Sequence, residues 1–228
     1  NFFFCSFFTC FIMKRKIIFA TVEAGGGHVA TAKAMSQSLD FFYPGKYETV
    51  VLDFMKEVGC TNFDIFHKRL WRFALRYPLF ARFGQLLIDR CPSLNIFFQR
   101  VILSSSSRKF YDYLSDHPVD LIVCNHPFLT TGFALAKRRF DMKLPILTFA
   151  TEPHMISALW ADPWADFIFT PNVETTKRLI SMGVPHSKLK TIGYPVQQSF
   201  LIKKNKADVR SHLKLKNRFT CVFFLGGE

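Results

Sequence analysis

Residues 16–28 read Lys-Ile-Ile-Phe-Ala-Thr-Val-Glu-Ala-Gly-Gly-Gly-His, and this stretch decides the fold. Residues 17–22 have the pattern of a strand buried on both faces, as in a parallel sheet. Gly25, Gly26 and Gly27 allow positive φ angles, and the Ala-rich segment 29–39 favours a helix. The pattern predicts a strand, a glycine loop and a helix whose free N–H groups suit a negative charge. A plain turn between strand and helix is the alternative, and His28 at the loop mouth favours proton transfer.

The composition is that of a globular protein that attracts polyanions. The 228 residues are 49% hydrophobic and 21% charged, which excludes a disordered chain. Thirty Lys and Arg residues against 17 Asp and Glu give a net charge of +13, so nucleic acid, anionic lipid and phosphorylated small molecules are all candidate partners. The six cysteines form no C-x-x-C pair, which favours reduced thiols in a cytosolic setting over disulfides or a metal site.

Short apolar and helix-favouring segments alternate beyond residue 40. Strands are expected at 47–54, 119–124, 144–150 and 167–170, with a short segment at 190–192, and helices at 129–140 and 173–182. This rhythm predicts an α/β fold with a doubly wound, Rossmann-like parallel sheet.

The two ends of the chain have a different character. Residues 1–12 form an aromatic-rich tract that we interpret as upstream or leader sequence before Met13, with an N-terminal membrane anchor as the alternative. Residues 203–218 are polar and basic, as in a linker. The apolar run 220–225 then leads into two glycines, so residues 219–228 are expected to begin a second α/β domain that is truncated here.

Residues 65–88 contain no acidic side chain, and their aromatic and basic residues alternate. On a helical wheel the aromatic residues fall on one side and the basic residues roughly opposite. Such a helix is typical of a membrane surface, and a core-facing helix with a solvated basic face is the alternative. The residues expected to bind the membrane are Phe66, Arg69, Trp71, Arg72, Phe73, Arg76, Tyr77 and Phe80.

Five motifs, taken in order, resemble one enzyme family. They are the strand into Gly25-Gly26-Gly27-His28, the segment with Tyr77-Pro78, the run 120–127, the segment 151–160 and Gly193-Tyr194-Pro195-Val196. Over about residues 15–200 the chain resembles the N-terminal half of the monogalactosyldiacylglycerol synthases and processive diacylglycerol glucosyltransferases. The resemblance implies a GT-B glycosyltransferase in which residues 13–202 form the acceptor and membrane-binding domain. The missing domain would bind the donor.

The resemblance also implies an activity and site residues. A hexose would pass from a UDP-sugar to diacylglycerol, with no metal or other cofactor, at the cytoplasmic face of a membrane to which the protein binds peripherally. His28 matches the family's histidine and is the expected base, Glu152 could orient it or the acceptor hydroxyl, and residues 25–27 would contact the donor. Trp160, His126 and His154 are the expected acceptor or lipid contacts. A core aromatic residue and a structural loop histidine are the alternatives for Trp160 and His126.

Two other functions stay open. One is a lipid-linked N-acetylglucosaminyltransferase of cell-wall synthesis, although its loop usually has glycines on both sides of a threonine. The other is a non-catalytic basic domain that docks on anionic membrane or RNA. No nucleic-acid-binding module is recognisable in the sequence, so no nucleic-acid partner is expected.

Overall fold

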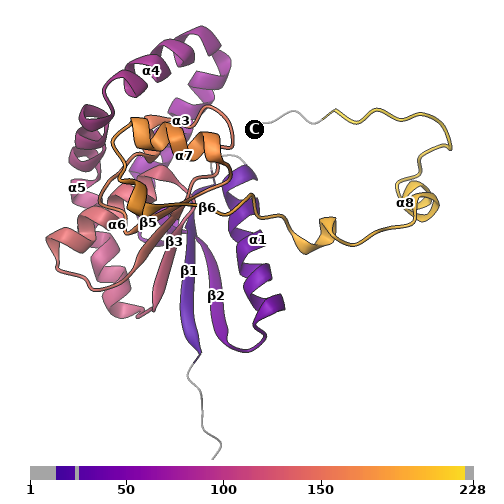
Figure 1. Cartoon of the computed structure of the whole chain (residues 1–228), viewed down its shortest axis with the longest axis horizontal. Coiled ribbons are helices and arrows are strands. Elements are labelled where there is room, and N and C mark those ends of the chain that lie inside the picture. The colour runs from indigo at the N-terminus through magenta and orange to yellow at the C-terminus, as the bar shows by residue number, and fades with distance from the viewer. Residues whose placement is uncertain (1–13, 24–25, 224–228) are drawn as a thin grey trace, which may run out of the picture.

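A computed structural model describes residues 14–23 and 26–223 of the chain (Figure 1). Its centre is a six-stranded sheet with parallel neighbours in the order β2-β1-β3-β4-β5-β6. The strands are β1 (Arg15–Thr21), β2 (Tyr47–Asp53), β3 (Leu121–Cys124), β4 (Ile146–Phe149), β5 (Phe167–Thr170) and β6 (Leu189–Thr191). The predicted parallel α/β sheet is confirmed. The strand order reverses between β1 and β3, and open sheets bind ligands beside such a point.

Helices cover both faces of the sheet (Figure 1). The α-helices are α1 (Gly26–Phe42), α2 (Phe54–Glu57), α3 (Thr61–Arg76), α4 (Pro78–Arg90), α5 (Pro92–Asp116), α6 (Pro127–Arg139), α7 (Val173–Ser181) and α8 (Lys206–His212). Short 3-10 turns are η1 (Ala158–Trp160), η2 (His186–Lys188) and η3 (Gln198–Phe200). Helix α1 packs on one face of β1, and α5 and α6 pack together on the other.

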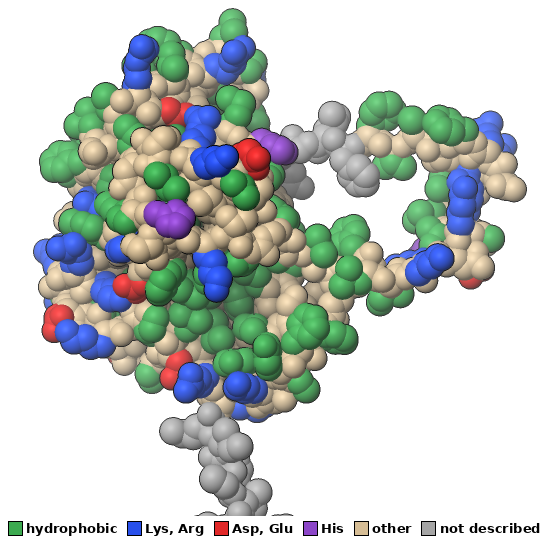
Figure 2. Space-filling view, viewed as in Figure 1, with side chains coloured by type: hydrophobic (Ala, Val, Ile, Leu, Met, Phe, Trp, Pro, Cys, Tyr) green, Lys and Arg blue, Asp and Glu red, His purple; other side chains and the backbone are tan. Residues whose placement is uncertain are grey.

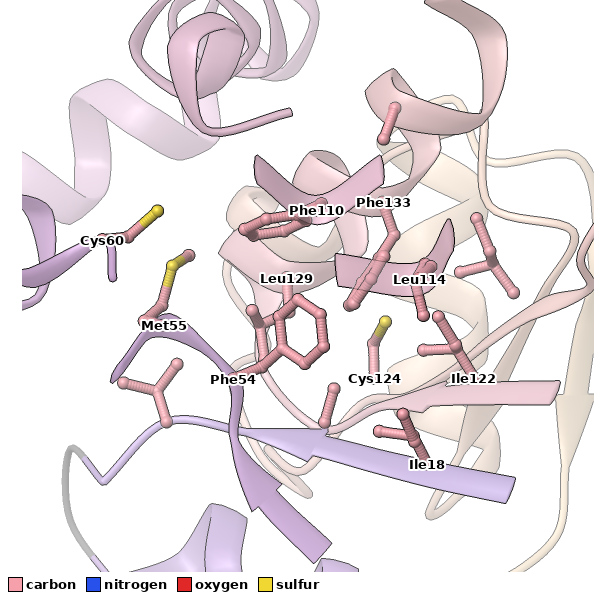
Figure 3. Packing of buried hydrophobic residues seen from close by; sticks show 14 of the residues in the cluster. Ile18, Phe54, Met55, Cys60, Phe110, Leu114, Ile122, Cys124, Leu129 and Phe133 are labelled. Atoms are coloured by element: carbon pink, nitrogen blue, oxygen red, sulfur yellow. The ribbon is translucent and has the colours of Figure 1, made fainter. Parts of the chain in front are cut away.

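The apolar run of β1 is buried on both faces because its side chains alternate between two cores. Ile17 and Phe19 pack towards α1, whereas Ile18 joins the cluster beneath α5 and α6. Figure 3 shows Phe110 and Phe133 meeting over the sheet in that second cluster. The two helices approach closely, because a Cβ added at Gly132 of α6 would lie 2.5 Å from Cε2 of Phe110.

Part of the sheet face beside α1 is open to solvent. Its hollow has a volume of about 570 Å³ and is lined mainly by apolar side chains of β1, β3, β4, β5 and α1. Figure 2 shows the hydrophobic side chains gathered on this face. The lining includes Phe19, Met35, Leu121, Leu147 and Phe169.

Three local predictions differ from the structure. Residues 65–88 form two helices, because Pro78 occupies the first turn of α4 and holds Tyr77 at φ −124° and ψ 74°, outside the helical region. The predicted linker contains α8, which begins at an Asn205 cap. Residues 220–223 of the predicted final strand have no regular structure, since a strand forms only on a neighbouring strand; residues 224–228 lie outside the described part.

Candidate active site

His28 is the centre of a cluster at the carboxyl edge of the sheet. It lies in the first turns of α1, half-buried, and its Nδ1 is 2.9 Å from the Thr151 hydroxyl, which follows β4. Its ring centroid is 4.8 Å from that of His126, which follows β3, and 6.1 Å from that of Trp160 in η1. The carboxyl ends of β1, β3 and β4 therefore place these side chains close together. Three of the residues that the sequence indicated as site candidates, His28, His126 and Trp160, lie in this cluster.

Burial lowers the pKa of His28 to about 4; a hydrogen bond with the Asn125 backbone opposes the shift, and repulsion from His67, when that ring is protonated, adds to it. The imidazole is therefore neutral at pH 7 and can accept a proton, but alone it is a weak base. Burial also lowers the pKa of His126 and of His67, whose rings lie 5.0 Å apart. Three neutral imidazoles thus form a row from α1 to α3.

Buried polar atoms without partners gather at the same edge. The Asn125 side chain has no exposed surface, and neither its Nδ2 nor its Oδ1 has a hydrogen-bond partner in the described part of the chain. His126 Nδ1 and Thr21 Oγ1 are also buried and have no hydrogen-bond partner among the described residues. Unpaired buried groups are costly, and each calls for an explanation such as a catalytic role or a bound water or ion. Sequence reasoning did not select Asn125 or Thr151 as site residues. The one signal in the sequence was their position directly after a predicted strand.

Glu152 is not hydrogen-bonded to His28. Its Oε2 accepts the Ser157 N–H at 3.0 Å, and Thr151, its neighbour in the chain, holds the imidazole instead. A direct hydrogen bond from Glu152 to His28 is therefore not formed in this structure, because the adjacent Thr151 makes that contact. Contact of Glu152 with the acceptor hydroxyl stays a prediction. Burial raises the pKa of Glu152, and the Trp160 indole and the Ser157 N–H limit the rise.

Two of the glycines at the start of α1 differ from the prediction in backbone conformation, whereas contact of residues 25–27 with the donor stays a prediction. Gly26 and Gly27 form its first turn and have no positive φ, while Gly25 lies outside the described residues. A Cβ at Gly26 or Gly27 would meet nothing within 4 Å, so this helix start is open. Tyr194 contacts the next turn of α1, with its hydroxyl 3.1 Å from Thr31 Oγ1. The open N–H groups remain suited to a phosphate.

Comparison with known proteins identifies the family. A family model described as monogalactosyldiacylglycerol (MGDG) synthase matches residues 28–196, from His28 through the loop that follows β6. The chain belongs to the MGDG synthase family. It is 22% identical to monogalactosyldiacylglycerol synthase 2, chloroplastic, of Arabidopsis thaliana and 23% identical to a probable MGDG synthase 2 of Oryza sativa subsp. indica. Each alignment covers 93% of this chain and 46% of the relative, so the chain spans slightly less than half the length of these relatives.

Solved structures with a similar backbone include a lipopolysaccharide outer core galactosyltransferase, WaaB, in its apo form. It is 12% identical, with a TM-score of 0.46 over 81% of this chain and 46% of that one. Anabaena Alr3699/HepE in complex with UDP-glucose is 16% identical, with a TM-score of 0.44 over 90% of this chain and 51% of that one.

Within this MGDG synthase family member, α3 and α4 expose the segment expected to bind membrane. Phe66 is 61% exposed, and Trp71, Phe73, Tyr77 and Phe80 are also exposed. So are Arg69, Arg72 and Arg76, so the aromatic residues do not form a core-facing stripe. The first half of α5 adds exposed apolar residues that sequence reasoning missed, namely Leu94, Phe97, Phe98, Val101 and Ile102. None of the described helices is long and apolar enough to cross a bilayer.

Two other expected contacts differ in their setting. Trp160 has no exposed surface and packs with Ile168 and Leu179, although one side of its indole lies near His28. His154 lies on an exposed bend, and among the described residues it makes no hydrogen bond or ring contact with the cluster. Direct contact of Trp160, His126 or His154 with a lipid acceptor stays a prediction.

Proposed function

We propose that the full-length protein transfers a hexose from a UDP-sugar to the hydroxyl of diacylglycerol at a membrane surface. In this proposal residues 13–202 are the acceptor half of a GT-B enzyme, residues 203–218 are a linker, and a donor-binding domain begins near residue 219. The observation that carries the proposal is the His28 cluster at the sheet edge, within the region matched by the MGDG synthase family.

The chemistry assigns a task to each part of the cluster. The acceptor hydroxyl loses its proton to His28 as its oxygen attacks the anomeric carbon, and the bond to the diphosphate breaks with its electrons leaving on UDP. The Thr151 hydroxyl fixes the imidazole through Nδ1. The diphosphate gains charge as the bond breaks, and the open N-terminus of α1 offers backbone donors and a favourable dipole. The proposal uses no metal ion or other cofactor, and the UDP-sugar is a co-substrate.

The exposed surface of α3 and α4 supplies the membrane contact in this proposal. Its aromatic side chains would enter the interface of the bilayer, and its arginines would meet anionic headgroups. The match to the MGDG synthase family favours diacylglycerol over the lipid-linked acceptor of cell-wall synthesis. Peripheral attachment is consistent with this docking mode, and its place at the cytoplasmic face stays part of the proposal.

The test uses the full-length protein with vesicles that contain diacylglycerol and anionic lipid. UDP-galactose, UDP-glucose and UDP-N-acetylglucosamine are supplied separately, and glycosylated lipid is measured. We expect a hexosyl diacylglycerol from one of the first two donors, and a loss of turnover of about 10²- to 10⁴-fold in His28→Ala, as for removal of a general base. The 228-residue chain alone should give no product. Absence of product with every donor, or normal turnover of His28→Ala, would contradict the proposal.

A further inference from the structure

The turn that carries Trp160 is held by the inner faces of α4 and α5. Asp89 of α4 accepts the Ala158 N–H through Oδ1 at 2.8 Å. Gln99 of α5 donates from Nε2 to the Leu159 carbonyl at 3.3 Å, and the neighbouring Arg100 pairs with the fully buried Asp162 at 2.5 Å. Segment 157–162 is thus fixed from outside, by two helices that precede it by about 60 residues in the chain.

Asp89 is an unfavourable residue at its position within α4. It lies in the last turn, where the negative end of the helix dipole repels a carboxylate. The carboxylate is mostly shielded from solvent and is fully used by other elements, since Oδ2 accepts from Arg178 Nη2 at 2.7 Å and Oδ1 also accepts from Gln85. The bonds to the turn and to α7 offset this local cost, so Asp89 serves the arrangement of elements and not α4 itself.

The opposite face of α4 is the exposed apolar one. Leu79, Phe80, Phe83, Leu86 and Leu87 are all more than half exposed, and they recur at the spacing of one helix face. Gln85 and Asp89 lie on the other face, towards Ala158. A single helix, 13 residues long, therefore separates the candidate membrane surface from the turn that places Trp160 beside His28.

We propose that Asp89 is a positioning residue, which holds Trp160 beside His28 from the membrane-facing helix α4. Docking of α4 on a bilayer and the arrangement of the His28 cluster are then linked through the bond from the Ala158 N–H to Asp89. This inference rests on the proposed membrane docking of α4, and it adds a residue that acts on the site without touching it.

The first measurement follows Trp160 in this chain. The sequence contains three tryptophans, so Trp71→Phe with Trp164→Phe leaves Trp160 as the single tryptophan. In the absence of vesicles, Asp89→Ala should increase quenching of Trp160 by acrylamide. Arg178→Ala, which keeps the bond to Ala158, should leave quenching at the level of the parent chain, and so should Asp112→Ala, which removes an exposed ion pair of α5. Equal quenching in the parent and Asp89→Ala, or equal increases in Asp89→Ala and Arg178→Ala, would overturn the inference.

The second measurement adds vesicles of phosphatidylcholine and phosphatidylglycerol and records binding and Trp160 emission together. We expect binding to shift the emission of the parent chain, and expect Asp89→Ala to bind equally while losing the shift. Asp89→Asn retains an oxygen for the Ala158 N–H and should restore it. Bound parent chain without any shift, or an unchanged shift in Asp89→Ala, would overturn the linkage alone. Absence of binding by the unsubstituted 228-residue chain would overturn the membrane surface and the linkage with it.

In the full-length enzyme, Asp89→Ala should lower kcat on vesicle-borne diacylglycerol by about 10- to 100-fold, the usual scale for misplaced catalytic geometry. Vesicle binding should stay unchanged, and Asp89→Asn should recover most of the loss. A defect that lies only in vesicle binding, with kcat preserved, would contradict the positioning role.

Discussion

The buried imidazole of His28 should make the protein less stable in acid, over a defined pH range. Burial lowers its pKa in the folded chain from the ordinary 6.5 to about 4. Between these two values the unfolded chain binds a proton that the folded chain does not. Stability from this group is therefore complete above pH 6.5 and is lost as the pH falls to about 4. Replacement by Gln removes the titration and keeps a side chain that can hydrogen-bond Thr151.

The magnitude follows from the two pKa values of His28. Each unit between folded and unfolded states is worth about 1.4 kcal/mol, so the full gap corresponds to about 3 kcal/mol of unfolding free energy. His67 and His126 also have lowered pKa values and steepen the acid dependence of both proteins, and the charge of His28 contributes to the lowered pKa of His126. The difference between the wild type and His28→Gln therefore reports His28 together with its coupling to His126.

The assay is urea unfolding of both proteins at several pH values from 7.5 to about 4, with each free energy extrapolated to water. We expect the wild type to lose about 3 kcal/mol more than His28→Gln over this range. His212→Gln, which changes an exposed histidine of α8, is the matched control and should follow the wild type. Parallel curves for the wild type and His28→Gln would refute the argument that burial keeps His28 neutral.

Three other changes test the membrane surface, the core and the division of the site. Charge reversal of the three arginines Arg69, Arg72 and Arg76 to Glu should abolish most vesicle binding at low salt, because each basic residue contributes about 1 kcal/mol. The same reversal of Lys203, Lys204 and Lys206 should not abolish binding. Equal losses in the two triple variants would refute a membrane surface localised on α3. Gly132→Ala should destabilise the fold by about 1–3 kcal/mol in thermal unfolding, because its Cβ meets Phe110, and Gly84→Ala in open space is the control that should not; an unchanged Tm of Gly132→Ala would refute the close approach. In the full-length enzyme, His28→Ala and Glu152→Gln should reduce kcat nearly additively, within about 0.5 kcal/mol, because their hydrogen bonds are separate; strong coupling in the double variant would refute this separation.

The sheet was predictable because its signals are local. The run 17–22 is apolar at every position except Thr21, so burial on both faces follows without knowledge of the partners, and β5 occupies the predicted residues 167–170. The break at Pro78 was also available from the sequence, since the residue before a proline avoids the helical region. The helical period of the aromatic residues runs on through the break and conceals it. Asn205 similarly indicated α8, because its side chain caps the Ala207 N–H at 2.8 Å.

The site was only partly predictable because its contacts are distant in sequence. His28 could be selected from the glycine pattern beside it, but its partner Thr151 lies 123 residues away. The sequence pointed to Glu152, the more reactive residue type, while the fold brings the adjacent hydroxyl to the imidazole. Asp89 and Ala158 are 69 residues apart, and an acid at the end of a helix reads locally as an unfavourable surface residue. The roles of Thr151 and Asp89 could therefore be identified only from the tertiary structure.

The separation of His28 from Glu152 constrains how the imidazole could become a sufficient base. A pKa of about 4 leaves little driving force for taking a proton from an alcohol, and a nearby negative charge is what raises the pKa of a histidine. Within the described residues no carboxylate is hydrogen-bonded to His28, since Glu152 is committed to the Ser157 N–H and Asp89 to Ala158 and Arg178. In the proposed reaction the diphosphate of the donor supplies that charge, next to the open start of α1. Proton transfer from the acceptor hydroxyl would then become favourable only when the donor is also bound.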